Sequence, residues 1–259
     1  MSKIIVCYKW VVDEEDIKFS SDNSSLNLTK AKNKISDYDK NSIEAAYEIA
    51  VTTGDTIAAL TFGTGEVKKS VKDVLIRGAD EAFVVCDDLA VVADAFITSE
   101  VLAAAIRTIG DYSLIICAEG ATDTYARQVG PRIGAILNLP VISCVSEIKL
   151  EENRLVARRK LEKVHEVVSV EGPAVICVLP EINKPPIPSL KASMAASKKP
   201  VHELKVAELG LDIDTLIPRT RVKSHKPYIM ERKNIIFCKG EAIERVSLLV
   251  DILRKEGAI

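Results

Sequence analysis

Short apolar runs alternate with amphipathic stretches along the first 145 residues of the chain. The runs are rich in β-branched residues, which is typical of strands, and apolar positions between them recur at three- and four-residue spacing, which predicts helices. The predicted strands are residues 3–8, 56–62, 82–86, 114–117 and 140–145, and the predicted helices are residues 40–51, 66–77, 91–109 and 124–137. Strands that are apolar almost throughout and alternate with helices indicate an α/β fold with a doubly wound, mostly parallel sheet.

The pattern changes after residue 145. Residues 147–170 alternate between polar and apolar positions, which predicts two or three further strands, and residues 181–189 hold three prolines and should form an extended, exposed segment. The remaining predictions are a polar surface hairpin or loop at 20–34, a buried strand at 172–178, a helix at 190–197, an irregular segment at 202–227 and an amphipathic helix at 242–255. We expect an α/β domain over residues 1–200, with a β extension at about 147–180, followed by a C-terminal arm over residues 201–259.

The stretch from Leu114 to Leu137 combines a buried strand, a small polar loop and a helix. This arrangement places unpaired backbone N–H groups and a helix N-terminus at the carboxyl edge of a sheet, where a phosphate group binds well. The alternative is a plain strand-to-helix connection in which Asp123 caps the helix and Gln128 is exposed. Residues 36–39 should reach an adenine or ribose across the same edge.

A second glycine-containing turn, Gly63-Thr64-Gly65, follows the predicted strand at 56–62. It lacks the third glycine of a dinucleotide-binding fingerprint and the Lys-Ser/Thr of a P-loop. We interpret these glycines as allowing a tight turn and a close backbone approach.

The composition excludes several classes of partner. The net charge of −2 over 259 residues argues against a nucleic acid as the main partner. No run of about eighteen apolar residues is present, so we expect no membrane span, and the chain enters a strand without a signal-peptide pattern, so we expect a cytoplasmic protein.

The sequence contains six cysteines and three histidines. Most of the cysteines close an apolar run, as in residues 4–7 and 114–117, so we expect reduced core thiols. No pair of cysteines or histidines has metal-ligand spacing, so no metal site is predicted. No nucleophile elbow or zinc-protease motif occurs, and the pattern suits a protein whose cofactor carries the chemistry.

Several stretches together resemble the beta subunit of electron transfer flavoproteins, in particular its Fix-type members. They are KIIVCYKWVVDEEDI at the start, KISDYDKNSIEAA, LIRGADEA, GATDTYARQVGPRIGAILNLP, RKLE with PAVIC, and INKPPIPSLKASMAASKKP. Their order and spacing cover essentially the whole chain. The resemblance implies a sheet of the adenine-nucleotide α-hydrolase-like type and a heterodimer whose alpha subunit holds FAD.

The resemblance also implies a function. The protein would transfer electrons between flavin-dependent dehydrogenases, of acyl-CoA type or similar, and an acceptor. It implies AMP in this chain, or a second FAD in electron-bifurcating members that use NADH. The positions that match the family's nucleotide site are Cys7, Ser36, Asp37, Tyr38, Asp39, Phe62, Ala118, Glu119, Gly120, Ala121, Thr122, Asp123, Thr124, Tyr125, Ala126, Arg127, Gln128 and Val129.

The resemblance also implies surfaces for partners. The proline-rich segment over 181–197 matches the family's recognition loop, whose anchoring leucine falls on Leu190, next to Ile187 and Pro188. Loops stiffened by proline lose less entropy on docking. The arm over residues 201–259 is expected to pack on the alpha subunit, and Arg159 matches the arginine of the family's signature segment.

The sequence departs from the family pattern at several places. Lys163-Val164 replaces an acid- or glycine-rich part of the signature, and Glu14 stands where some members place a flavin-contacting tyrosine. Two other functions share the sheet architecture. One is an adenine-nucleotide-binding regulatory module similar to universal stress proteins. The other is an ATP pyrophosphatase, which is disfavoured because no SGGxDS-like loop follows the first strand.

Overall fold

The computed structural model describes residues 2–20, 24–151, 154–227 and 232–259. The chain divides into a main unit, Met1–His225, and a C-terminal unit, Lys226–Ile259. The two units are described separately below.

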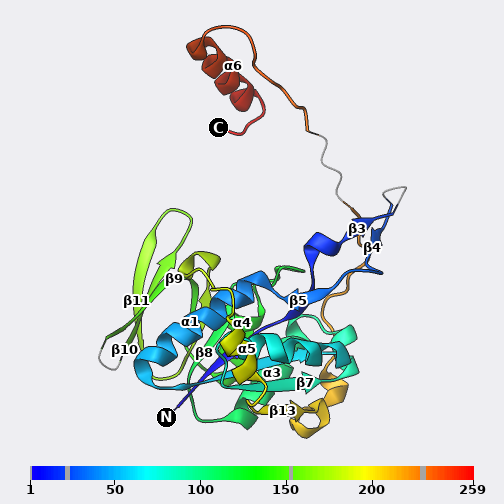
Figure 1. The fold of residues 1–259 in the computed structure, drawn as a ribbon, viewed down its shortest axis with the longest axis vertical. Helices are drawn as coiled ribbons and strands as arrows, with labels where there is room; N and C mark the ends of the chain where they lie inside the picture. Colours follow the sequence, from blue (N-terminus) through cyan, green and yellow to red (C-terminus); the bar gives the residue numbers. More distant parts are fainter. Residues whose placement is uncertain (1, 21–23, 152–153, 228–231) are drawn as a thin grey trace. The chain divides into compact units, whose positions relative to one another are not determined.

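The main unit is built on a nine-stranded sheet with the order β11-β10-β9-β12-β8-β1-β6-β7-β13 (Figure 1). These strands are β1 (Lys3–Cys7), β6 (Thr56–Gly63), β7 (Glu81–Cys86), β8 (Tyr112–Ala118), β9 (Val141–Glu151), β10 (Arg154–Lys160), β11 (His165–Glu171), β12 (Ala174–Val178) and β13 (Val201–Leu204). The seven strands from β9 to β13 in this order run parallel, whereas β10 pairs antiparallel with both β9 and β11. The prediction of a doubly wound, mostly parallel α/β sheet is therefore confirmed.

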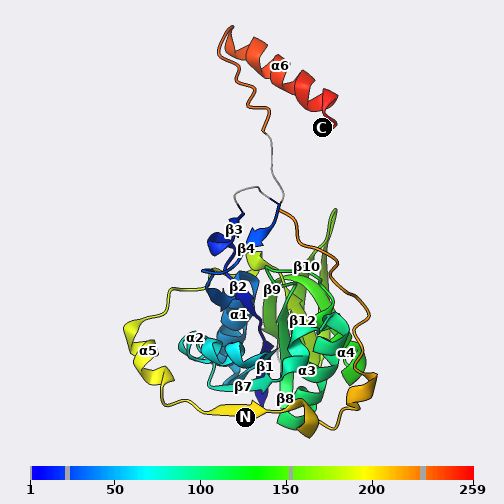
Figure 2. The same ribbon diagram turned by 90° about the vertical axis from the view of Figure 1, so that its right-hand side faces the viewer.

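Helices cover both faces of the sheet. The helices of this unit are α1 (Asp37–Thr53), α2 (Val71–Ile76), α3 (Ala95–Ile109), α4 (Val129–Leu137) and α5 (Leu190–Ala196). Figure 2 shows α1 and α2 on one side of the sheet and α3 and α4 on the other. Successive residues of β1 pack against the helices on opposite faces of the sheet. Ile4 packs with Ile43 of α1, and Ile5 packs with Ile97 of α3.

Two small antiparallel sheets and several short turns complete the main unit. The small strands are β2 (Trp10–Val12) with β5 (Asn33–Ile35), and β3 (Lys18–Phe19) with β4 (Leu26–Asn27). The short 3₁₀ helices are Glu14–Asp16, Gly65–Ser70, Asp88–Val91, Pro180–Ile182, Val206–Glu208 and Ile213–Thr215.

Several predicted boundaries were wrong for identifiable reasons. The helix expected from residue 124 begins at Val129, because Tyr125 and Arg127 adopt left-handed φ angles of 45° and 57° that no α-helix accommodates. The helix expected from residue 91 begins after Asp94, whose carboxylate caps it by accepting from the N–H groups of Phe96 and Ile97.

Other predicted segments also differ from the structure. The strand expected at 140–145 continues to Glu151, because pairing with β10 extends it. The helix expected at 66–77 starts as the 3₁₀ turn Gly65–Ser70 and becomes α2 only at Val71. The segment expected to be irregular from residue 202 begins with β13, which extends the sheet beside β7.

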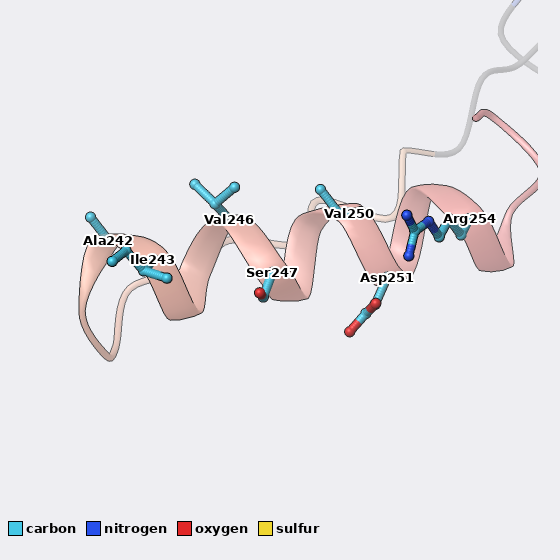
Figure 3. Close-up of a pocket in the computed structure, with 7 residues that line it drawn as sticks. All are labelled: Ala242, Ile243, Val246, Ser247, Val250, Asp251 and Arg254. Atoms are coloured by element: carbon cyan, nitrogen blue, oxygen red, sulfur yellow. The ribbon is translucent and has the colours of Figure 1, made fainter.

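The described part of the C-terminal unit contains one helix, α6 (Ala242–Lys255), with the bounds that the sequence predicted. None of its residues is buried, and a hollow of about 400 Å³ is lined by Ala242, Ile243, Val246, Ser247, Val250, Asp251 and Arg254 (Figure 3). Lys233 forms an ion pair of 2.7 Å with Glu256 and joins the preceding segment to the end of the helix. The run ending in Cys238 is not a strand, and Cys238 is exposed, so the expectation of a core thiol was wrong there.

Candidate functional site

The candidate site lies where the strand order of the sheet reverses. After β1 the chain builds β6 and β7 on one side, and it then crosses to build β8 and β12 on the other. Cys7, Phe62 and Ala118 stand at or next to the carboxyl ends of β1, β6 and β8, three neighbouring parallel strands. The carboxyl edge at such a switch point is where doubly wound sheets bind ligands.

The loop between β8 and α4 presents free backbone amides. Hydrogen bonds occupy the N–H groups of Thr122 and Tyr125, whereas those of Ala126, Arg127, Gln128 and Val129 have no partner among the described residues. We call these four N–H groups the amide cradle. Arg127 is left-handed and Gln128 right-handed, an alternation that turns successive N–H groups toward one concave side and favours an anion there.

Side chains from two other segments fasten this loop. The Oγ of Ser36 accepts from the N–H of Thr122 at 3.2 Å, although Ser36 occupies the N-cap position of α1 and makes no cap bond with its side chain. Lys9 forms an ion pair with Asp123, and its own backbone N–H donates to Asp39 at 2.8 Å. The loops after β1 and β8 are therefore held together over the switch point.

Asp39 is the buried acid of this edge, with 5% of its surface exposed. Burial raises its pKa from the model-compound value of 3.8 to about 7, and the negative charge of Asp123 adds to the increase. Hydrogen bonds from the Lys9 N–H and from Ser36 favour the ionised form and limit the shift. Asp39 therefore changes charge near neutral pH.

Two aromatic rings and two charged side chains form the outer wall of the site. The rings of Tyr38 and Tyr125 lie 5.4 Å apart, and Arg127 stacks over Tyr125 at 5.8 Å while forming an ion pair with Glu119. A hollow of about 420 Å³ adjoins this wall and is lined by Tyr38, Glu119, Tyr125, Lys160, Leu161, Glu162, Leu179, Pro180 and Glu181. A ligand that carries a flat ring with polar edges would fit against these aromatic and charged side chains.

The structure brings most of the predicted site residues together. Around the switch point it places Cys7, Ser36, Tyr38, Asp39, Ala118, Glu119, Gly120, Ala121, Thr122, Asp123, Thr124, Tyr125, Ala126, Arg127, Gln128 and Val129. Phe62 packs against the core on the α3 side, and Val129 does the same. Asp37 lies beside them at the start of α1, but its carboxylate pairs with Lys34 and Lys40.

The predicted role of Asp123 as a helix cap was wrong, because its carboxylate pairs with Lys9 and accepts from the N–H of Thr124. Gln128 is exposed, as the alternative interpretation expected, and its side chain accepts from Arg132. Arg159 bonds the carbonyl of Ser143 and pairs with Glu166, within the β extension.

Sequence reasoning missed Lys9, and it noted Lys160 as one of three consecutive cations without placing it at this site. Lys9 follows directly after the first strand, where a cation meets the switch point, and this position was an available signal. Lys160 reaches the hollow only because β10 folds back along β9, which no local pattern reveals.

The predicted partner-docking residues lie away from this edge, after β12. Ile187 is 95% exposed between Pro186 and Pro188, and Leu190, the first residue of α5, is 80% exposed. Ser189 caps α5 by accepting from the N–H of Ala192, which fixes the start of the helix. The structure thus presents Ile187 on an extended, proline-rich segment and Leu190 at the start of the helix that follows it.

One buried hydroxyl provides a test of whether a polar ligand fits the site. The Oγ1 of Thr122 is buried and has no hydrogen-bond partner in the structure. A buried, unpaired hydroxyl is unfavourable, and a polar ligand group over the loop would satisfy it. Together with the free amides, this atom fits a phosphorylated nucleotide.

No group of three or more His, Cys, Asp or Glu side chains within the described ranges could hold a metal ion. A search of the helices among the same residues finds none with the length and apolar character needed to cross a bilayer.

The fold and the loop define a doubly wound α/β protein with an anion-binding geometry at its switch point. The family model of the electron transfer flavoprotein domain matches residues 25–209, and the chain belongs to this family. The resemblance seen in the sequence is confirmed at this level. Membership supports a role in flavin-associated electron transfer and gives no support to the regulatory module of the stress-protein type.

Proposed function

We propose that this chain is the beta-type subunit of a heterodimeric electron transfer flavoprotein and binds an adenine nucleotide at the carboxyl edge of β1 and β8. The observation that carries the proposal is the amide cradle at the switch point, found in a chain of this family. AMP and FAD share the adenosine phosphate that the cradle and Thr122 would hold.

Each side chain of the site has a role in this proposal. The free N–H groups of residues 126–129 bind phosphate, and Ser36 and Lys9 keep the loop in place. Tyr38 and Tyr125 offer a flat wall to a planar ring. FAD, when bound, supplies the electron-transfer chemistry, and the protein excludes water and orients the ring.

Two surfaces suit the partners of such a subunit. The exposed pair Ile187 and Leu190 suits a flavin-dependent dehydrogenase of acyl-CoA or similar type. The C-terminal unit suits the alpha subunit, because a 14-residue helix without a buried residue gains too little from its own packing to be stable alone. NADH is the expected further reactant if the complex bifurcates electrons.

The central experiment counts flavin and AMP in the native complex. One flavin and one AMP per heterodimer support a simple carrier, and two flavins without AMP support a bifurcating one. A complex that carries neither AMP nor a second flavin contradicts a nucleotide site in this chain. The cytoplasmic location is tested by fractionating cells that produce the native complex.

A pair of threonine variants tests the site itself. Thr122→Val removes the unpaired hydroxyl, so we expect nucleotide affinity to fall about tenfold, the equivalent of one hydrogen bond, while the free protein gains about 1 kcal/mol of stability. Thr61→Val is the matched control, because the Thr61 hydroxyl is also buried and unpaired but lies within β6. The control should gain stability without losing affinity. Equal affinity in both variants would contradict a ligand contact at Thr122.

A further inference from the structure

Four of the six thiols stand in a row across neighbouring strands. Cys7, Cys117, Cys177 and Cys144 belong to β1, β8, β12 and β9, which are consecutive in the sheet, and the first three lie at or near the carboxyl ends of their strands. Cys7, Cys117 and Cys177 are buried, whereas Cys144 is partly exposed. The row therefore has one end that solvent reaches.

Cys144 lies opposite Cys177 across an irregularity in the pairing of β9 with β12. Ile142 pairs with Ile176 and Val145 with Val178, so two residues of β9 face the single residue Cys177. This is the geometry of a β-bulge. Neighbouring strands are about 4.8 Å apart, which is within the Cα separation that a disulfide spans.

The surroundings of Cys144 differ from those of an inert core thiol. Its φ angle is 59°, a left-handed conformation that is uncommon for a residue other than glycine and often marks a functional position. The Nη2 of Arg127 lies 3.9 Å from its Sγ, within hydrogen-bond reach of a sulfur atom. Both features favour Cys144 as the thiol that reacts first.

Cys177 has the properties of a second, resolving thiol. Burial raises its pKa, and the nearby sulfur groups of Cys117 and Cys144 add to the increase, so it stays a protonated thiol and is not the group that attacks the peroxide. Cys117 also pairs with Cys177 in the sheet, but its pKa is raised by a hydrogen bond with Cys7 and by burial, and no solvent reaches it.

We propose that Cys144 and Cys177 form a reversible disulfide when the protein meets a hydroperoxide. The Cys144 sulfur attacks the peroxide, the O–O bond breaks, and Cys144 becomes a sulfenic acid while water is released. The Cys177 sulfur then displaces the hydroxyl group as a second water, and the S–S bond forms. The two thiols lose two electrons, which reduce one hydrogen peroxide. This covalent site goes beyond the proposed nucleotide binding and does not depend on it.

The test uses the full chain, purified reduced and then freed of reductant. After treatment with hydrogen peroxide, free thiols are blocked with N-ethylmaleimide, and the protein is digested with trypsin without reduction. Cys144 lies in the tryptic peptide 133–149 and Cys177 in the peptide 164–191. We expect these peptides as one linked species, lighter than their sum by two hydrogen atoms and separated again by dithiothreitol.

Three variants decide the outcome. Cys144→Ser and Cys177→Ser should each lose the linked species, while the control Cys86→Ser, which removes another partly exposed thiol on β7, should keep it. Circular dichroism checks folding, and Cys144→Ser carries the test if the buried Cys177→Ser variant does not fold. Unlinked peptides after peroxide, or a link from Cys117 to Cys7 or Cys177 instead, would overturn the proposal.

Discussion

At the scale of single residues, the buried carboxyl of Asp39 links the switch point to pH. Its folded-state pKa of about 7 lies above the value of 3.8 for the unfolded chain, so the folded protein binds more protons between these pH values. The free energy of unfolding therefore falls as the pH rises from about 4 to 7 on account of this group, and it does not change further above that range.

The variant Asp39→Asn tests this dependence. Asparagine still accepts the N–H of Lys9 but does not titrate, so the variant should gain stability relative to the wild type as the pH rises from 4 to 8. Each pKa unit corresponds to about 1.4 kcal/mol, and we expect a relative gain on the order of 3 kcal/mol in urea unfolding at the two pH values.

Asp37→Asn is the matched control for this experiment. Partial burial disfavours the charge of Asp37, but the ion pairs with Lys40 and Lys34 outweigh it and lower its pKa. The stability that this group contributes is lost only as the pH falls below about 4, so the control should show almost no relative change between pH 4 and 8. A wild-type protein and an Asp39→Asn variant with parallel pH profiles would contradict a raised pKa at Asp39.

Gly130 provides the second prediction at this scale. A Cβ at this position would overlap the Sγ of Cys177 and press on Cys117, so Gly130→Ala should cost about 1–3 kcal/mol of stability. Gly65→Ala is the control, because a Cβ there meets no atom within 4 Å. Urea midpoints measure both variants, and the double variant Gly130→Ala/Cys177→Ala should recover part of the loss. Equal midpoints for Gly130→Ala and Gly65→Ala would contradict close packing at Gly130.

At the scale of elements, the apolar periodicity of the sequence predicted the strands and helices whose positions depend on packing. It missed the element boundaries that depend on the backbone angles of single residues. The strands around β1 and the helix α6 were predicted because apolar spacing reports directly on burial and helical faces. The start of α4 was missed because Tyr125 and Arg127 are left-handed, a property that neither residue type signals. The fastening of the loop by Lys9 and Ser36 depends on contacts between segments more than 80 residues apart.

The proline-rich segment carries the prediction for this scale. Ile187→Ala and Leu190→Ala remove exposed side chains, so stability should stay within about 0.5 kcal/mol of the wild type. If the segment docks a dehydrogenase, each variant should weaken binding about tenfold or more, as for an apolar anchor. Val91→Ala, at an exposed valine elsewhere on the main unit, should leave binding unchanged. Wild-type affinity in both loop variants, measured by calorimetry with the flavin-dependent dehydrogenase, would contradict docking there.

At the scale of the whole molecule, the sequence predicted the class of fold because strand and helix alternate up to residue 145. The joining of β13 to the edge of the sheet was not predictable, since its four residues, VHEL, do not alternate in polarity and fit an edge strand and an irregular segment equally well. The division into two units appears only when contacts are known, because no proline- or glycine-rich linker marks it.

A chain that ends at His225 tests the independence of the main unit. All nine strands of the sheet and helices α1 to α5 lie before this point, so the shortened chain should unfold within about 2 °C of the full chain. It should no longer pair with the alpha subunit in size-exclusion chromatography if the C-terminal unit holds that partner. A large drop in thermal stability would show that the main unit depends on α6, and retained pairing would place the alpha subunit elsewhere.

The exposed apolar side chains of α6 have a consequence for how the protein is made. This helix is synthesised after the nine-stranded sheet, so every newly made copy exposes these side chains until another surface covers them. Chaperones and proteases recognise exposed apolar segments of this kind. A cell that makes this chain in excess over its partner should therefore degrade the unpaired copies. The amount of this chain that accumulates would then depend on how much of the partner is made.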